Sequence, residues 1–388
     1  MQFVEPSVTP IPSGCDSSPT SLLRVIERAY RICYRSEGNM KDGSEELIGR
    51  ILYNIPNGKA IHSSPLEHRR IMLSCNSWIA SAIGRWQKER STAFIRILPN
   101  NETNSVHSHI LEGNFRAFFD FVSECYNSLH STTRDITTYE SAYLHRAQLT
   151  VNHELNHHFP IVFKETENTN QYSVVDCNDI KYIGESKDYM SFHVVTTRDV
   201  LQEIARNRTI SPNVESTRYC NYNKKGMCFC IPRPYEWTTN IEWTDNLSDY
   251  IERTTRPFTV ANSKDETATV VDVSTGEETE RVIHSETRIY HEVSAKTIID
   301  NASSMLELYM LMTSTSEAAY NKAIELGCKP EEARMLLLGG LKTEMILTGR
   351  MSDWARFLKL RNAPEAHPQI RYIAKQIDKW FLDRLASK

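Results

Sequence analysis

The chain has 388 residues, of which 40% are hydrophobic and 24% are charged, and its formal net charge is −4. This is the composition of a globular protein with a sizeable core, and the acidic balance disfavours nucleic acid as a partner. We expect neither a signal peptide nor a membrane span, because the sequence lacks the apolar runs that both require. The nine scattered cysteines include no CxxC pair, which predicts reduced thiols and a cytoplasmic protein.

The first part of the chain predicts an arm followed by helices and a strand. Residues 1–17 are rich in Pro and Ser, which favours a loose N-terminal arm. A helix is expected to begin near Ser18, and a second, shorter helix is expected over 45–53. A turn-like loop with the sequence HSSPLEH then leads into a strand over 69–75.

A long stretch over about 76–188 has the properties of an insertion. Its pattern predicts a helix over 114–129 and strands over 147–151 and 172–176. After it, Met190, Phe192 and Val194 alternate with polar residues, which predicts a strand.

That strand leads into the most distinctive stretch of the chain. In TTRDVLQEIA the apolar residues follow helical spacing, and Thr196 or Thr197 can cap the helix. Residues 206–219, RNRTISPNVESTRY, then bring together three arginines and two serines. Arginine matches phosphate oxygens with a planar fork of donors, and serine adds neutral donors, so this cluster predicts a phosphate-bearing ligand. A solvated basic loop is the alternative.

The rest of the chain predicts a hairpin and then mostly helices. A polar region over about 240–293 contains two strand-like runs that favour a surface hairpin. A long helix is expected over 301–326, with Gly327 at its end, and LKTEMILT has the pattern of a strand. Two further helices are expected, one capped by Ser352 and one beginning near Pro368.

Three blocks of the chain together resemble the flavin-dependent thymidylate synthases, the ThyX-type enzymes. The pattern Arg-x-Arg, seven residues, then Ser-x-Arg-Tyr is similar to the family's signature. HSSPLEH resembles an upstream loop of that family, and the segment from Glu332 to Arg371 resembles its closing block. The resemblance implies an α+β, ThyX-type fold with a central mixed sheet and flanking helices. It would form one catalytic domain over 18–388, interrupted by the insertion.

The resemblance also implies a reaction and its cofactors. A ThyX-type enzyme binds FAD, takes a hydride from NADPH, and transfers a one-carbon unit from methylene-tetrahydrofolate to C5 of dUMP, giving dTMP. The family further implies a homotetramer. Two alternatives remain: C5 methylation or hydroxymethylation of a different pyrimidine nucleotide, and a homologue that binds flavin or nucleotide without turnover.

Carried over by position, the resemblance assigns the site residues. The FAD site would be lined by His62, Ser64, Glu67, Arg206, Asn207, Arg208 and Asn213. The nucleotide would be held by Glu203, Ser216, Arg218, Arg334 and Arg361. Of these, the residues expected to act in catalysis are Glu203, Arg218 and Arg361.

Three positions depart from the family's pattern. The family has His between its paired arginines, Gln three residues before them, and Glu one residue after Asn213; this chain has Asn207, Glu203 and Val214. An ionised carboxylate accepts hydrogen bonds but donates none, so Glu203 would favour the exocyclic amine of cytosine over uracil. The family's glutamate is displaced here to Glu215, and we expect Val214 and Glu215 to point in different directions.

A second motif points to different chemistry. The segment His153–His157, HELNH, matches the HExxH pattern of zinc proteases. Strand-like residues before it and Pro160 after it favour a polar loop, with catalytic zinc and a structural metal site as alternatives. We therefore expect no metal.

Overall fold

The structure is a computed structural model. It describes residues 2–11, 19–40, 47–48, 64–88, 95–101, 106–130, 139–159, 178–239, 266–271, 278–283, 299, 302 and 304–387. The helix predicted over 45–53 and the strand predicted over 172–176 therefore lie largely or wholly outside the described residues.

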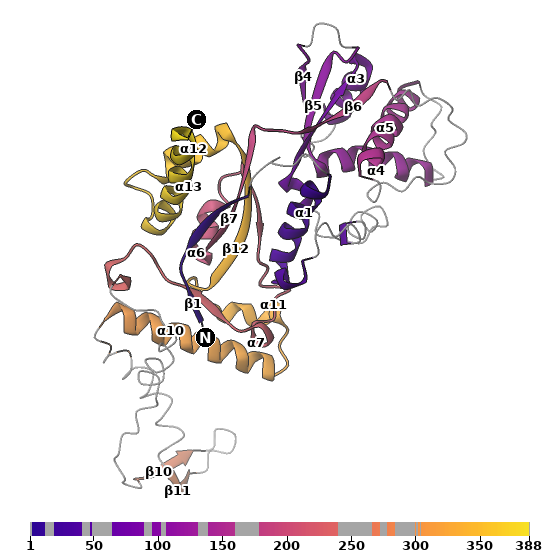
Figure 1. Cartoon of the computed structure of the whole chain (residues 1–388). Helices are drawn as coiled ribbons and strands as arrows, with labels where there is room; N and C mark the ends of the chain where they lie inside the picture. The colour runs from indigo at the N-terminus through magenta and orange to yellow at the C-terminus, as the bar shows by residue number, and fades with distance from the viewer. Residues whose placement is uncertain are drawn as a thin grey trace. The chain divides into compact units, whose positions relative to one another are not determined.

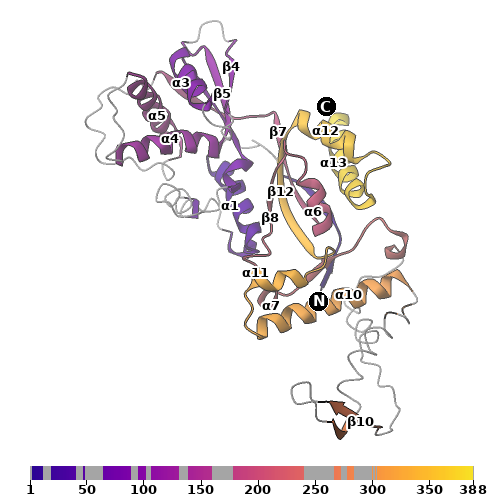
Figure 2. The same ribbon diagram turned by 180° about the vertical axis from the view of Figure 1, so that it is seen from behind.

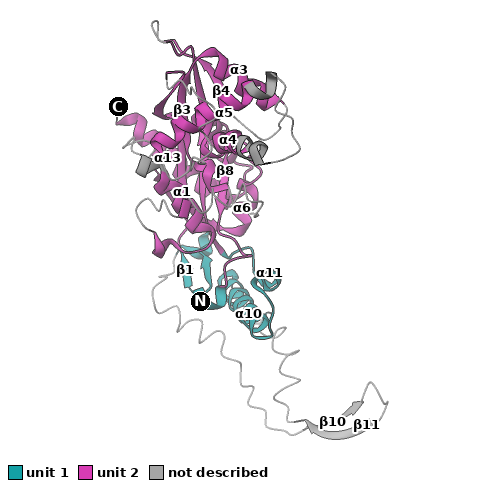
Figure 3. Cartoon of the chain, turned by 90° about the vertical axis from the view of Figure 1, so that its right-hand side faces the viewer, with its two compact units in different colours: residues 1–4, 222–341 teal, residues 5–221, 342–388 magenta. Residues whose placement is uncertain are grey.

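The chain divides into two compact units, coloured separately in Figure 3. One unit combines residues 1–4 with 222–341, and the other combines residues 5–221 with 342–388. The larger unit is discontinuous in sequence, because the chain leaves it after Asn221 and returns to it at Lys342. The single catalytic domain predicted over 18–388 stays a prediction.

The larger unit contains a four-stranded sheet in which every neighbouring pair is antiparallel. Its strands, in sheet order, are β2 (Ser7–Ile11), β7 (Tyr189–Thr197), β12 (Lys342–Arg350) and β8 (Ser211–Val214). The prediction of a loose arm is thus wrong for residues 2–11, since β1 (Gln2–Val4) is also a strand. Pro10 is compatible with β2 because β2 is an edge strand.

Helices cover both faces of this sheet, as the two opposite views show (Figure 1, Figure 2). On one face, α1 (Pro19–Cys33) packs Ala29 and Ile32 against Ile346 of β12. On the other face, Trp354 is fully buried beside Phe192. The helices on this second face are α6 (Arg198–Ile204), α12 (Met351–Arg361) and α13 (Pro368–Ala386).

The helix caps agree with the sequence in one case and differ in another. Thr197 caps α6, because its side chain accepts a hydrogen bond from the backbone N–H of Val200. Ser352 does not cap α12; the cap position is Arg350, which makes no side-chain cap bond. Helix α12 begins one residue before Ser352, so this serine lies inside the first turn.

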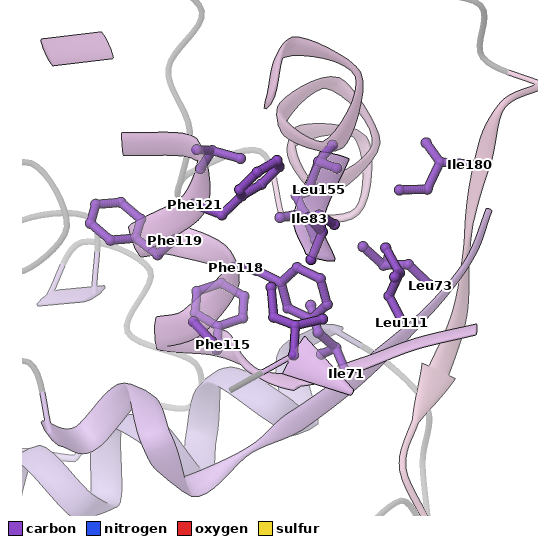
Figure 4. Close-up of a cluster of buried hydrophobic side chains, with 14 of the residues drawn as sticks. Ile71, Leu73, Ile83, Leu111, Phe115, Phe118, Phe119, Phe121, Leu155 and Ile180 are labelled. Atoms are coloured by element: carbon purple, nitrogen blue, oxygen red, sulfur yellow. The ribbon is translucent and has the colours of Figure 1, made fainter. Parts of the chain in front are cut away.

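The predicted insertion contributes most of a second antiparallel sheet. Its strands, in sheet order, are β4 (Ile95–Pro99), β5 (His109–Asn114), β3 (Arg70–Cys75) and β6 (Ile180–Glu185). The helices are α3 (Ser77–Lys88), α4 (Phe115–His130) and α5 (Tyr139–His158). Phe115, Phe118 and Leu155 point from the helices towards Leu73 and Leu111 (Figure 4).

The strand predicted over 147–151 is wrong, because these residues lie in the middle of α5. Ala147, Val151 and Leu155 are fully buried at a spacing of four residues, which is the period of a helix face. Burial of that face outweighs the preference of Thr and Val for strands.

The smaller unit is built around one long helix. Helix α10 (Met305–Glu325) is capped by Ser304 and is followed by Gly327, whose φ is +93°. Strand β1 pairs in parallel with β9 (Cys228–Cys230). Shorter helices of this unit are α7 (Tyr222–Lys225), η4 (Glu236–Thr238), α11 (Pro330–Ala333) and η5 (Arg334–Leu336).

The predicted hairpin is confirmed as the antiparallel pair β10 (Glu266–Val271) and β11 (Glu278–Ile283). The α+β class is confirmed as well. The described residues form two four-stranded sheets and two two-stranded pairs, and both four-stranded sheets are antiparallel where a central mixed sheet was expected.

Candidate functional site

Two of the predicted nucleotide residues form an ion pair. Glu203 lies at the end of α6 and Arg361 is the last residue of α12, and 158 positions separate them in the sequence. Arg361 Nη1 donates to Glu203 Oε2 over 3.1 Å, and Nη2 donates to the Glu203 carbonyl oxygen over 2.9 Å. Both side chains are partly exposed, at 20% for Arg361 and 30% for Glu203, so the pair remains accessible to a ligand.

The pair has unsatisfied hydrogen-bonding capacity. The Nε atom of Arg361 is buried and has no hydrogen-bond partner among the residues that the structure describes. The Nδ1 atom of His367 lies 4.0 Å from the second carboxylate oxygen of Glu203, Oε1. A guanidinium group beside a carboxylate offers hydrogen-bond donors and acceptors side by side, and such a pair can bind the polar atoms along one edge of a planar heterocycle.

The loop after α6 presents exposed cationic side chains. Arg206 and Arg208 are both exposed, and between them Asn207 shapes the turn. The Asn207 N–H donates to the Ile204 carbonyl over 2.9 Å, and the Asn207 carbonyl accepts from Ile210 N–H over 3.2 Å. The backbone is therefore fixed while both guanidinium groups stay available to an anion.

Ser64 and Asn213 meet although 149 positions separate them. Ser64 belongs to η2 (Ser64–His68), and its hydroxyl donates to Asn213 Oδ1 over 2.6 Å. The amide nitrogen of Asn213 donates to the Ala29 carbonyl and, over 2.9 Å, to the Cys33 sulfur. Asn213 is only 1% exposed. This geometry gives Asn213 a supporting role between β8, η2 and α1, and direct contact with a flavin stays a prediction.

The segment Ser216–Tyr219 is attached to the end of α1. The Ser216 N–H donates to the Cys33 carbonyl over 3.0 Å, and the Ser216 hydroxyl accepts from the Arg218 N–H over 3.2 Å. The ring of Tyr219 stacks on Tyr34 with centroids 5.2 Å apart, and the Arg218 guanidinium lies 5.3 Å from the Tyr219 centroid. Since Arg218 is exposed and Tyr219 is 52% exposed, this segment offers a cation and an aromatic face together.

Val214 and Glu215 point in different directions, as the sequence predicts. Val214 packs against the core formed with α6, α12 and α13. Glu215 is 2% exposed, and its carboxylate lies 3.0 Å from Lys342 Nζ and 3.9 Å from Arg35 Nε.

Lys342 connects Glu215 to a larger charged cluster. Its Nζ lies 2.6 Å from Glu344 Oε1, and the other oxygen of Glu344 lies 2.9 Å from His193 Nε2. His193 Nδ1 is 3.4 Å from Arg28. Burial raises the pKa of Glu344, but the His193 hydrogen bond and the Lys342 charge outweigh it and lower the pKa to about 2. Burial raises the pKa of Glu37, which faces the same cluster.

The depressed pKa predicts a pH-dependent effect of Glu344→Gln. A carboxylate with a lowered folded pKa stabilises the fold above its ordinary pKa of 4.5, and this contribution is lost as the pH falls towards about 2. We expect the variant to lower the free energy of unfolding by about 1–3 kcal/mol at neutral pH and by less as the pH decreases. Urea unfolding between neutral and acidic pH measures this. The exposed Glu325→Gln is the control, and a difference that does not change with pH would contradict the prediction.

The remaining predicted residues are not brought into one cluster. Glu67 accepts a 2.6 Å hydrogen bond from Arg116. Arg334 is exposed and belongs to the smaller unit. His62 lies outside the described residues. Within the larger unit, the Ser64–Asn213 contact lies on the α1 face of the sheet and the Glu203–Arg361 pair belongs to the helices of the opposite face.

The sequence reasoning missed two features. Tyr34 could have been found from the sequence, because Tyr30 and Tyr34 are four residues apart, which places them one helical turn from each other. In the structure their ring centroids lie 4.9 Å apart. The cluster around Lys342 gave no such signal, since its members come from α1, β7, β12 and the residue that follows β8, and the register of the sheet brings these together.

The HELNH motif lies in the last turns of α5 and not in a loop, which corrects the prediction. The Glu154 carboxylate accepts a hydrogen bond from the Tyr182 N–H and lies 3.2 Å from His158, so the motif's glutamate is engaged. In the described parts of the chain, no three His, Cys, Asp or Glu residues gather in a geometry that could hold a metal ion. No helix in those same parts is long and apolar enough to cross a membrane.

A family comparison covers two of the three sequence blocks, and the HSSPLEH block lies outside the matched range. The model of the family Thy1, described as thymidylate synthase complementing protein, matches residues 187–384, just over half of the chain. A comparison with curated proteins finds no match. Similar solved structures include the UMP/dUMP methylase PolB from Streptomyces cacaoi, bound with 5-Br dUMP or with 5-Br UMP, at 19% and 16% identity and a TM-score of 0.28 for both. The matches cover 50% of this chain and 66% and 69% of those chains, so the first spans just under two thirds of its relative.

Proposed function

Because the chain belongs to the thymidylate synthase complementing protein family, Thy1, we propose that it is an FAD-dependent methyltransferase acting at C5 of a pyrimidine nucleotide. The proposed substrate is dUMP and the proposed product is dTMP, with methylene-tetrahydrofolate as carbon donor and NADPH as reductant. The observation that carries the proposal is the accessible Glu203–Arg361 pair, which joins two blocks of the family's pattern.

Arginine and serine side chains of the larger unit suit a nucleotide monophosphate. Arg218 is exposed next to Ser216 and would bind the phosphate. Arg361 would donate to a carbonyl oxygen of the base, since its guanidinium is already oriented by Glu203. Tyr219, stacked on Tyr34, would offer a flat surface for an aromatic ring.

The residues present also fit a flavin nucleotide. Arg206 and Arg208 are exposed on a backbone that hydrogen bonds hold in place, and such paired guanidinium groups match a pyrophosphate. Ser64 and Asn213, which hydrogen-bond to each other, would contribute polar groups to the flavin site from the α1 face of the sheet. When bound, FAD would supply the reducing chemistry that completes the methyl group.

The chemistry proposed here requires no protein nucleophile, and the local thiols suit none. Cys33 and Cys220, which lie beside the 206–219 stretch, are both fully buried. Burial raises the pKa of Cys33 to about 12, so its thiolate is scarce at neutral pH.

We further propose a homotetramer with shared sites. In the larger unit, Ser64 and Asn213 lie on the α1 face of the sheet and the Glu203–Arg361 pair lies among the helices of the opposite face, so a single copy does not bring these two groups together. Association of copies would bring one face of a protomer to the other face of its neighbour. Size measurement by light scattering, with and without dUMP, tests this.

The function is tested by a spectrum and a turnover assay. We expect the purified protein to show flavin absorption, directly or after reconstitution with FAD. We also expect dUMP, in the presence of methylene-tetrahydrofolate, to stimulate NADPH oxidation and release of the C5 proton. A protein that cannot be reconstituted with FAD would contradict the proposal.

The same assay with dCMP and UMP tests the second candidate function. Glu203 replaces the glutamine of the family's pattern, and a carboxylate can accept from the exocyclic amine of cytosine. Turnover of dCMP above that of dUMP would favour C5 methylation or hydroxymethylation of a cytosine nucleotide.

A further inference from the structure

We propose that Lys342 is a positioning residue for the nucleotide site. It holds the buried carboxylate of Glu215 and thereby fixes the next residues, Ser216–Tyr219. The functional part of this inference rests on the proposed function, which assigns Ser216 and Arg218 to the nucleotide. The structural part stands on the contacts alone.

The pairing of Lys342 with Glu215 is buried and close. The two side chains are 7% and 0% exposed, and Nζ lies 3.0 Å from Oε2. Arg35 also faces Glu215 but lies further away, with its Nε at 3.9 Å from the other carboxylate oxygen. Of these two cations, Lys342 is therefore the nearer to Glu215.

A buried carboxylate is strongly unfavourable without a compensating charge. Lys342 contacts the carboxylates of both Glu215 and Glu344, so replacing it by an apolar residue removes a compensating charge from each. Glu344 would keep His193 as a neighbour. Glu344 is partly exposed at 23% and can be solvated where it is. Glu215 can reach water only if its backbone moves.

Movement of Glu215 would act directly on the site segment. The Glu215 N–H donates to the Glu344 carbonyl over 2.9 Å, which extends the pairing of β8 with β12. The next residue, Ser216, is bonded to the Cys33 carbonyl, and Tyr219 stacks on Tyr34. The Glu215 carboxylate and N–H thus attach this segment to β12, whereas Ser216 and Tyr219 connect it to the end of α1 and to the residue that follows it.

The test uses Lys342→Met, which keeps the length of the side chain and removes its charge. Two quantities are measured: amide hydrogen exchange of the peptide containing residues 215–220, and KM and kcat for dUMP. We expect exchange in this peptide to increase at least tenfold and the KM for dUMP to rise at least tenfold, with kcat within about twofold. In Lys342→Arg, which keeps the positive charge, both the exchange of this peptide and the KM for dUMP should lie close to the wild-type values.

The matched control is Glu185→Gln. Glu185 forms an equally buried pair with Arg69, at 3.5 Å, in the second sheet. This variant should leave both the exchange of residues 215–220 and the KM for dUMP unchanged, even if it lowers global stability by a similar amount. If Lys342→Met does not fold, Glu215→Gln replaces it, with an expected increase of three- to tenfold in both quantities.

Unchanged exchange of residues 215–220 in a folded Lys342 variant overturns the inference, and so does an equal increase in Glu185→Gln. Exchange requires no ligand, so it reports on positioning even if wild-type protein binds no pyrimidine nucleotide. If wild-type protein binds no pyrimidine nucleotide, the proposed function is overturned, but the exchange result for the positioning of residues 215–220 still stands.

Discussion

Arg361→Ala is expected to lower kcat/KM for the pyrimidine nucleotide by at least about a hundredfold. The guanidinium can make two charge-assisted hydrogen bonds, each worth about 1.5–3 kcal/mol, and about 1.4 kcal/mol corresponds to a factor of ten. Removing it also frees the Glu203 carboxylate, which would then repel a nucleotide phosphate. Steady-state kinetics with dUMP measure the effect, and thermal unfolding verifies that the variant folds.

Two further variants distinguish the effect of the planar donor pair of Arg361 from the effect of its positive charge. Arg361→Lys keeps the charge and loses the planar pair of donors, so we expect an intermediate loss. Lys359→Ala removes an exposed cation from the same helix and should change kcat/KM by less than about twofold. An Arg361→Ala enzyme with the activity of Lys359→Ala would show that the pair is only structural.

Glu203→Gln is expected to shift the preference between bases towards uracil. The carboxylate only accepts hydrogen bonds, whereas a glutamine amide can also donate to a uracil carbonyl. A mismatched hydrogen-bonding group costs about 1–3 kcal/mol, so the ratio of kcat/KM for dUMP to that for dCMP should rise about ten- to a hundredfold. Parallel assays with the two nucleotides measure this ratio.

The control for this change is Glu365→Gln. Glu365 is exposed in the loop that follows α12, so this substitution alters the same charge near the site without altering the pair. It should leave the ratio within about twofold of the wild-type value. If Glu203→Gln also leaves the ratio unchanged, Glu203 does not face the base, and the cytosine hypothesis should be abandoned.

Much of the fold could be predicted because its elements have strong periodic patterns. The strand at Tyr189–Thr197, the helix at Phe115–His130 and the strand at Lys342–Arg350 were all predicted to within a few residues. Predictions failed where burial overrides local preference. Residues 147–151 favour a strand locally but form the buried face of a helix, and residues 7–11 pair along the edge of a sheet.

The candidate site was predictable in its residues and not in its geometry. The spacing of the arginines and serines in 206–219 and the two flanking blocks identified the family, which the family comparison confirms. Spacing could not show that Asn213 is enclosed by Ser64 and α1, or that Tyr34 supports Tyr219. These contacts depend on how distant segments pack.

The sequence by itself determined the family and the kinds of side chain available for phosphate and base recognition, because both depend on residue type and local order. Only the tertiary structure decided which of them meet. Arg361 pairs with Glu203 across 158 positions, and the displaced Glu215 is buried against Lys342. Such pairs follow from strand register and from the closure of long segments of chain, and neither is encoded in local spacing.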